Sequence, residues 1–204
     1  MGAYRIDQDR DDAVTMSSDE NSVARYLDQL ASLITALPRE PIYRAAKHLH
    51  TRWQLGASFI TAGNGGSAAT ASHLAGDLCK ATRHDLRKPV RAMCLNDNMT
   101  ALTAWANDTT YGQALAEQLH SLGESGDVFI PISGSGNSVN ILQATAYAKD
   151  HRMFVIALTG MGGQLAAMAD IVIAVPSLDM PLIEDCHMAI GHVLTNAVRE
   201  AIAR

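Results

Sequence analysis

Five short apolar segments alternate with helical patterns along most of the chain, and this alternation limits the possible fold more than any other feature. The segments are ASFITA (57–62), VRAMCL (90–95), DVFIPI (127–132), FVIALT (154–159) and DIVIAV (170–175). Four of the five are rich in β-branched or aromatic residues, which favour strands. Helical patterns fill the gaps at 66–80, 98–122, 137–149, 163–168 and 181–203. Strands that alternate with helices form parallel sheets, so we predict an α/β three-layer sandwich around a five-stranded parallel sheet.

The segment before the first predicted strand has a different pattern. Residues 1–16 are polar and weakly patterned, which predicts a flexible tail. A helix is expected to begin at Ser17 or Ser18, and a second helix near Pro41, ending at Gly56. We therefore expect one domain over 17–204 with an N-terminal helical extension. The first helix carries an apolar stripe on residues 23–34, which we expect to pack between subunits because five other helical segments already cover the sheet.

Composition and charge argue against several classes of protein. The 204 residues are 48% hydrophobic and carry a net charge of −5, and the basic residues of RHDLRKPVR are interleaved with others, so no nucleic-acid partner is expected. No apolar run approaches the ~20 residues of a membrane span, and the polar start does not match a signal peptide. Three scattered cysteines do not form a disulfide framework. A cytoplasmic enzyme or binding protein fits these features.

Glycine-serine turns follow two of the predicted strands. The first is Gly63–Ser67 and the second is Ser133–Ser138. Glycines let backbone N–H groups approach an anion, and a helix N-terminus and serine hydroxyls add further donors. Neither turn matches the phosphate-binding loop of nucleoside triphosphatases or the dinucleotide fingerprint. A sugar phosphate is therefore the expected ligand, rather than ATP or NAD.

Acidic and histidine side chains on two predicted helices provide the chemistry. His73 and Asp77 are four residues apart, so they lie on one helix face. The last helix adds Glu184, Asp185, His187 and His192. Such a set suits either a metal ion or a proton-transfer pair. Spacing alone pairs Glu184 with His187, since about 12 Å of helix and about 80° of rotation separate Glu184 from His192. Physical reasoning alone leaves the choice between the histidines open.

The order of these motifs resembles a known family. The chain is similar to the sugar isomerase (SIS) domain, and to its phosphoheptose isomerase branch, over about residues 20–203. The segments that carry the resemblance are GNGGSAATASHLAGDL, AWAND, ISGSGNS, ALTGMGG and IEDCHMAIGH. The resemblance implies an aldose-ketose isomerase that converts sedoheptulose 7-phosphate to a D-glycero-aldoheptose 7-phosphate. It also implies a homotetramer with active sites between subunits, and one divalent ion, zinc, at each subunit's site.

The resemblance also assigns site residues. The implied zinc ligands are His73, Asp77, Glu184 and His192. The implied substrate-binding residues are Asn64, Gly65, Gly66, Asp77, Asn107, Asp108, Ser133, Gly134, Ser135, Ser138 and Glu184, with Ser67 as a further phosphate ligand. Asp77 and His192 are the implied catalytic residues. This assignment favours His192 over His187, so the last helix must bend or the ligands must come from more than one chain.

The chain departs from the family pattern at four positions. Asp77 replaces the usual glutamate and Glu184 the usual glutamine, while Leu182 replaces an arginine and Gly134 a threonine. The site therefore carries one more negative charge than the pattern. The shorter carboxylate of Asp77 matters because a misplacement of about 1 Å can cost on the order of 100-fold in rate. A different stereochemistry at C2 of the product, or a related heptose as substrate, therefore stays open.

Two functions of different classes are considered. In the first, Asp77 removes the C1 proton of the ketose and returns it at C2 through an enediol, while His192 or the metal stabilises charge on the oxygens. In the second, the chain is a non-catalytic SIS module that senses a sugar phosphate or is a scaffold for a partner such as a replication initiator. Some homologues of that kind lack the acid-histidine set. In this chain the four implied ligand positions, 73, 77, 184 and 192, all hold residues that can bind a metal ion, which favours the enzyme.

Overall fold

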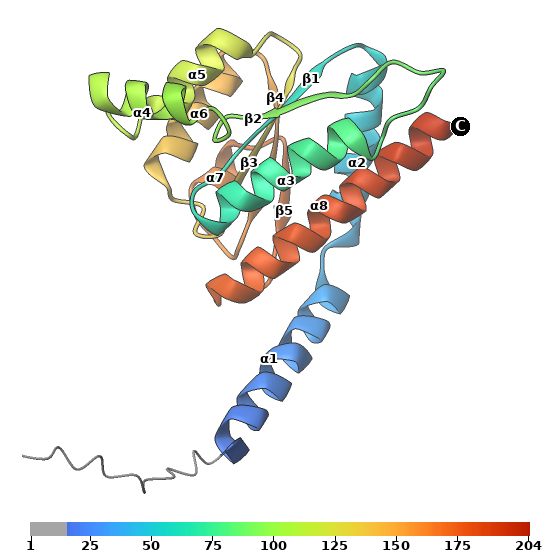
Figure 1. Ribbon diagram of the computed structural model, residues 1–204, viewed down its shortest axis with the longest axis vertical. Coiled ribbons are helices and arrows are strands. Elements are labelled where there is room, and N and C mark those ends of the chain that lie inside the picture. Colours follow the sequence, from blue (N-terminus) through green and yellow to red (C-terminus); the bar gives the residue numbers. More distant parts are fainter. Residues whose placement is uncertain (1–15) are drawn as a thin grey trace, which may run out of the picture.

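The computed structural model describes residues 16–204, with side chains from residue 21 onward, and the predicted tail of residues 1–16 falls almost entirely outside this range. Figure 1 shows a central sheet with helices on either side, as predicted. The elements are α1 (Met16–Ala36), α2 (Arg39–Gln54), β1 (Ser58–Ala62), α3 (Gly66–Lys80), β2 (Arg91–Cys94), α4 (Met99–Asp108), α5 (Ala114–Leu122), β3 (Val128–Ser133), α6 (Val139–Asp150), β4 (Phe154–Thr159), α7 (Leu165–Met168), β5 (Ile171–Ala174) and α8 (Met180–Ala203).

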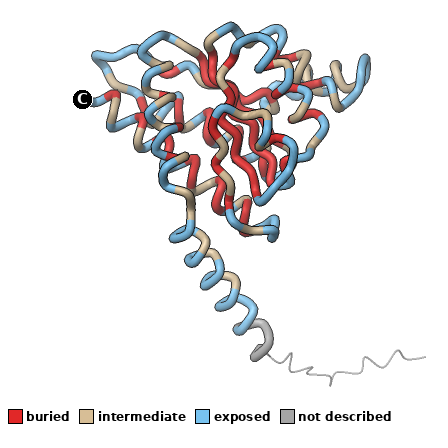
Figure 2. The backbone as a smooth tube through the Cα atoms, turned by 180° about the vertical axis from the view of Figure 1, so that it is seen from behind, coloured by how far each residue is buried: buried red, intermediate tan, exposed pale blue. Residues whose placement is uncertain are grey.

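The five strands form one parallel sheet in the order β2-β1-β3-β4-β5, so the prediction of a five-stranded parallel sheet is confirmed. Every residue of β1 and β3 is buried, and Figure 2 shows the buried residues concentrated in the central sheet. Burial on both faces explains why the strands read as continuous apolar runs rather than alternating ones.

Helices cover both faces of the sheet, which gives the predicted three layers. One face packs against α2, α3 and α8, and its core includes Phe59, Ile130 and Leu158. The opposite face packs against α5, α6 and α7, and its core includes Ile60 and Phe129. Neighbouring residues of one strand thus belong to different cores, as the alternating direction of side chains along a strand requires.

The connections out of β1 and β3 determine where a ligand can bind. After β1 the chain passes through α3 to β2 on one side, and after β3 it passes through α6 to β4 on the other side. β1 and β3 are neighbours in the sheet, so the strand order reverses between them. A crevice forms at such a point beyond the carboxyl ends of the strands. Both glycine-serine turns, 63–67 and 133–138, lie at this position.

The N-terminal helix α1 projects away from the sheet (Figure 1). Leu30 and Leu33 pack against the core on the α8 side, and the Tyr26 hydroxyl donates a hydrogen bond of 2.7 Å to Asp185. That bond raises the pKa of Tyr26 to about 12. Val23 and Leu27 are exposed at 60% and 58%. The predicted stripe is therefore divided between a half-buried and an exposed part.

The predicted helix over 98–122 is instead two helices. Asn98 caps α4 by accepting a hydrogen bond from the N–H of Ala101, and α4 ends at Asp108. The intervening residues 109–113, TTYGQ, contain two β-branched threonines and a glycine, which are weak helix formers, and the helix is interrupted there. No helix in residues 16–204 has the length and apolar character that a membrane crossing requires.

Candidate active site

Both glycine-serine turns lead directly into helix N-termini that lack a side-chain cap from the N-cap residue, although Asn140 Oδ1 accepts a hydrogen bond from the N–H of Ile141 in the first turn of α6. α3 begins after Gly65 and α6 after Ser138, and neither of these N-cap residues uses its own side chain to bond the first turn. The first-turn N–H groups of the two helices therefore have no side-chain acceptor from their N-cap residues. Such uncapped N-termini favour an anion through their donors and their dipole.

The serines of the turns lie around these two N-termini. Ser67 and Ser133 are buried, and the Oγ atoms of Ser133 and Ser138 lie 3.4 Å apart. Ser135 is exposed, and its Oγ accepts a hydrogen bond from the N–H of Asn137. Gly134 is buried, and a Cβ at this position would lie 2.4 Å from the sulfur of Met180. Met180 thus takes the space that a side chain at position 134 would need.

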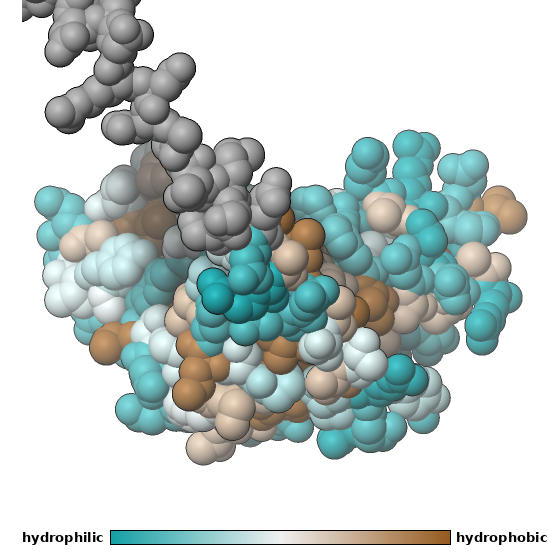
Figure 3. Space-filling view, turned by 90° about the horizontal axis from the view of Figure 1, so that it is seen from below, coloured by the Kyte–Doolittle hydropathy of each residue, from teal (hydrophilic) through white to brown (hydrophobic). Residues whose placement is uncertain are grey.

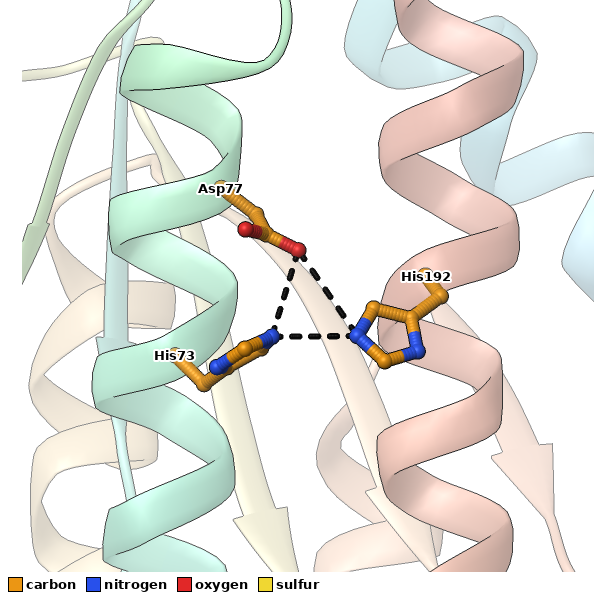
Figure 4. Close-up of polar contacts among 3 residues, drawn as sticks. All are labelled: His73, Asp77 and His192. Atoms are coloured by element: carbon orange, nitrogen blue, oxygen red, sulfur yellow. Dashed lines mark hydrogen bonds and ion pairs between the residues drawn. The ribbon is translucent and has the colours of Figure 1, made fainter.

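Three candidate ligands meet between α3 and α8 (Figure 4). His73 and Asp77 extend from α3, with 3.3 Å between His73 Nε2 and Asp77 Oδ2. His192 extends from α8, with its Nε2 atom 3.0 Å from His73 Nε2 and 3.8 Å from Asp77 Oδ2. The structure therefore brings together three of the four predicted metal ligands.

The donor atoms of this group have the spacing of metal ligands. Tetrahedral zinc with bonds of about 2.0–2.1 Å places its donor atoms about 3.3 Å apart, and the three distances here scatter around that value. Two imidazoles and one carboxylate also form a donor set that zinc, manganese or iron accepts. The residues present therefore fit a divalent ion.

Glu184 lies at a different point of the same helix pair. A Cβ on Gly66 would lie within 2.6 Å of both carboxylate oxygens of Glu184, so that carboxylate rests on the bare Cα of Gly66. Because Glu184 is beside Gly66 and His192 is beside His73, α3 and α8 run side by side in the same direction (Figure 1). About 10 Å of helix separates Gly66 from His73, so Glu184 is not part of the three-residue group.

His187 is not at the site. It is fully buried, and its Nε2 atom lies 3.1 Å from the carbonyl oxygen of Thr159 at the end of β4. Burial lowers its pKa from 6.5 to about 4. α8 is continuous from Met180 to Ala203, so no bend brings Glu184 and His192 together. The choice between the two histidines, which spacing left open, follows from the helix packing.

Replacing His187 with glutamine should weaken the acid sensitivity of folding. Below pH 6.5 the unfolded chain binds a proton that folded His187 accepts only near pH 4, so this residue reduces the free energy of unfolding as the pH falls through that window. The full effect is about 3 kcal/mol. Urea unfolding between pH 7.5 and 4, at one protein concentration, should show a shallower decline for His187→Gln. Replacement of the exposed His120 should leave the decline unchanged. Equal slopes for parent and His187→Gln would contradict this assignment.

The predicted substrate residues Asn107 and Asp108 lie at the exposed end of α4. The Asn107 side chain donates to Asp108 Oδ1 at 2.9 Å. The segment after α4 contacts the first glycine-serine turn through Tyr111, whose hydroxyl donates a hydrogen bond to Asn64. Asn64 is also bonded to Asn140, in the first turn of α6. Sequence reasoning missed Tyr111 and Asn140, because neither stands at a glycine-serine turn or in the acid-histidine set.

The fold and site together define a class of protein. A model described as SIS domain matches residues 24–160, which is more than half of the chain. Four of the five strands, both glycine-serine turns, and the candidate ligands His73 and Asp77 lie within that span. The chain belongs to the SIS domain family.

Full-length relatives narrow the class to one branch. The phosphoheptose isomerase of Aneurinibacillus thermoaerophilus is 38% identical over 173 residues, which cover 82% of this chain and 87% of that protein. The phosphoheptose isomerase of Paramagnetospirillum magneticum is 37% identical over 185 residues, covering 90% and 95%. The solved structure of a phosphoheptose isomerase from Francisella tularensis matches with a TM-score of 0.82 and 33% identity, covering 92% of this chain and all of that one. Within the SIS family, the chain therefore groups with the phosphoheptose isomerases.

Proposed function

We propose that the protein is a phosphoheptose isomerase that interconverts sedoheptulose 7-phosphate and a D-glycero-aldoheptose 7-phosphate. One observation carries this proposal. His73 and Asp77 of α3 meet His192 of α8, and α3 is the helix that begins at the first glycine-serine turn. One helix thus offers an anion site at its start and proton-transfer groups further along. The relatives are named phosphoheptose isomerases, which supports a phosphorylated heptose as the class of substrate.

The turns at the switch point hold the phosphate in this proposal. Donors come from the first-turn N–H groups of α3 and α6, apart from that of Ile141, and from the hydroxyls of Ser67, Ser133, Ser135 and Ser138. Gly65, Gly66 and Gly134 let the ligand approach the backbone, and Asn107, Asp108 and Glu184 would contact the sugar. Because the phosphate does not react, its binding energy serves to position the distant C1 and C2 carbons.

Asp77 moves the proton in this proposal. Its carboxylate removes the C1 proton of the ketose to form an enediol and returns the proton at C2. His192, 3.8 Å from the Asp77 carboxylate, donates to or accepts from the substrate oxygens as charge shifts between them. The proton finishes on C2, and the carbonyl group moves from C2 to C1, so the reaction needs no external oxidant or reductant.

His73, Asp77 and His192 would hold a divalent ion, for which zinc is our first choice. When bound, such an ion acts as a Lewis acid toward the substrate oxygens. Glu184 stays a proposed fourth ligand, supplied by a side-chain movement or by a neighbouring subunit, because its carboxylate lies against Gly66 here. The group of His73, Asp77 and His192 also argues against the non-catalytic alternative, because a sensor or scaffold does not require these residues.

We also propose that the protein forms a homotetramer through α1, with active sites between subunits. Figure 3 views the side from which α1 projects, where hydrophobic residues lie among hydrophilic ones. Val23 and Leu27 on α1 are exposed, and their burial against a second copy would remove apolar surface from water.

A cytoplasmic location fits the three free cysteines. Residues 17–204 would then form one SIS domain with its N-terminal helices.

Light scattering after size-exclusion chromatography should give about four chains of 21.8 kDa per particle. Introducing charges with Val23→Asp and Leu27→Asp should produce smaller particles, because each would bury an unpaired carboxylate at the interface. Leu86→Asp, at a position that is 87% exposed, is the matched control and should stay tetrameric. A parent protein that remains monomeric at micromolar concentration would refute this assembly.

The substrate assignment is tested with purified protein and sedoheptulose 7-phosphate. Carbon-13 NMR should show an aldose C1 signal that grows at the expense of the ketose C2 signal. Sedoheptulose without the phosphate should react far more slowly, because it lacks the remote binding energy. Lack of aldose formation by metal-loaded protein would leave the non-catalytic module as the better explanation.

A further inference from the structure

The loop that follows β4, GMGGQ at residues 160–164, packs against the second glycine-serine turn. The Gly160 N–H donates to the carbonyl oxygen of Gly134 at 3.0 Å, which continues the pairing of β3 with β4 beyond the two strands. Where the loop ends, the N–H of Leu165 donates to the carbonyl oxygen of Gly136 at 3.0 Å. The backbone of the turn is therefore held from both ends of the loop.

Gly163 brings the backbone of the loop into direct contact with the turn. A Cβ atom at this position would lie 2.5 Å from the carbonyl oxygen of Ser135 and 2.6 Å from the Cα of Gly136. Backbone atoms cannot swing aside as a flexible side chain can, so a larger residue would displace either the turn or the loop. The neighbouring Gly162 differs, because a Cβ there would meet no atom within 4 Å.

The Asn137 side chain links the same loop to Ser135. Its Oδ1 accepts a hydrogen bond of 3.1 Å from the N–H of Gln164, and its Nδ2 donates to the carbonyl oxygen of Ser135 at 3.1 Å. The Asn137 N–H donates to Ser135 Oγ at 3.2 Å. Ser135 is thus held at both of its oxygens, while its hydroxyl keeps a hydrogen that it can donate to a ligand.

We propose that the loop of residues 160–164 positions the second glycine-serine turn for the phosphate group of the substrate, with Gly163 and Asn137 as the positioning residues. The inference rests on the proposed function, which assigns the phosphate to the turns. Glycines at 134 and 136 would otherwise give the turn many accessible conformations. Contacts with the loop remove that freedom before the ligand arrives, so less free energy is lost in ordering the donors when phosphate binds.

Alanine substitutions at Gly162 and Gly163 test this role as a matched pair. Both residues have positive φ, +94° and +86°, so alanine strains the backbone at either position, but only at 163 would its Cβ meet the turn. Gly163→Ala should raise the Kd for inorganic phosphate and the KM for sedoheptulose 7-phosphate by roughly 10- to 100-fold, which corresponds to one hydrogen bond to a charged group. Gly162→Ala should retain the parent's values, although both variants lose thermal stability.

Isothermal titration calorimetry measures the Kd, with the metal content of each protein confirmed equal to that of the parent. An unchanged Kd in Gly163→Ala, or an equal loss of affinity in both variants, would overturn the proposal. A parent protein that binds no phosphate would overturn it as well. If the parent binds phosphate but forms no aldose, the proposed isomerase function fails, and the phosphate measurements still decide the role of the loop.

Asn137→Ala decides if Gly163→Ala does not fold in a thermal melt. Asn137 is exposed, so its truncation should leave the fold intact while it releases both Ser135 and Gln164. The Kd for inorganic phosphate should rise by roughly 3- to 10-fold, the range for one neutral hydrogen bond. Asn196→Ala, at an exposed position on α8, is the matched control and should bind phosphate like the parent. Equal affinities for Asn137→Ala and Asn196→Ala would refute the positioning role.

Discussion

Replacing Asp77 with asparagine should abolish isomerisation while leaving the fold intact. A carboxylate can take up and return a proton, whereas an amide of nearly the same shape cannot, so we expect turnover to fall by about 100- to 10,000-fold. The side chain is at the surface of α3, with 29% of its area exposed, so the substitution should not disturb packing. Turnover of sedoheptulose 7-phosphate, measured with each protein loaded with the same metal, gives the comparison.

Two controls make the Asp77 result interpretable. Asp85→Asn, at a side chain that is 89% exposed, should retain full activity. The metal content of Asp77→Asn must equal that of the parent, because loss of a ligand could also abolish turnover. If metal-loaded Asp77→Asn still exchanges the C1 hydrogen of the ketose at the parent's rate, Asp77 only holds the ion. The base would then have to be sought at His192, since buried His187 faces Thr159.

Replacing His73 with alanine should remove the bound metal. His73 Nε2 lies at the centre of the group, 3.0 Å from His192 and 3.3 Å from Asp77, so its loss removes one of three converging donors. Substitution of a residue that merely supports a ligand costs about 10- to 100-fold in metal affinity, and loss of a ligand should cost at least that much. Mass spectrometry of protein purified without added metal, and zinc competition against a chromogenic chelator, measure the effect.

His120→Ala is the control for this experiment, because His120 is an exposed histidine on α5, away from the group. It should retain the parent's metal content. A His73→Ala protein that binds as much metal as the parent would show that the site lies elsewhere. Glu184, which lies against Gly66, would then be the first alternative to test.

The fold was predictable because its signals are local. The apolar runs that became β1 and β3 are buried on both faces, and each is followed by a glycine-serine turn that begins a helix. The break between α4 and α5 was missed, since apolar residues on both sides of residues 109–113 are read together as one helical pattern over 98–122. The strand order also lies beyond single-sequence reasoning, because nothing in β1 itself states that β3 is its neighbour.

The candidate site was predictable only in part. The spacing of His73 and Asp77 placed both on one helix face, and they do meet. The distance between Glu184 and His192 signalled a difficulty, and the continuous α8 keeps them apart. Which histidine faces α3 depends on how two helices rotate against each other, and this is a property of packing rather than of spacing. The contact of Tyr111 with Asn64 spans 47 residues and has no local signature.

Hydrogen exchange during turnover in deuterated water is the most direct test of the enediol reaction. Metal-loaded protein is incubated with sedoheptulose 7-phosphate, and proton NMR and mass spectrometry follow both sugars. We predict that aldoheptose 7-phosphate forms with deuterium at C2, and that recovered ketose carries deuterium at C1, with both absent for Asp77→Asn. The proton held on Asp77 exchanges with solvent in competition with its return to C2, so partial incorporation of deuterium is sufficient to support the enediol. Aldose that forms with no deuterium at all would favour direct hydride transfer from C1 to C2 and contradict an exchanging base, and absence of aldose from the parent reaction would contradict the isomerase function itself.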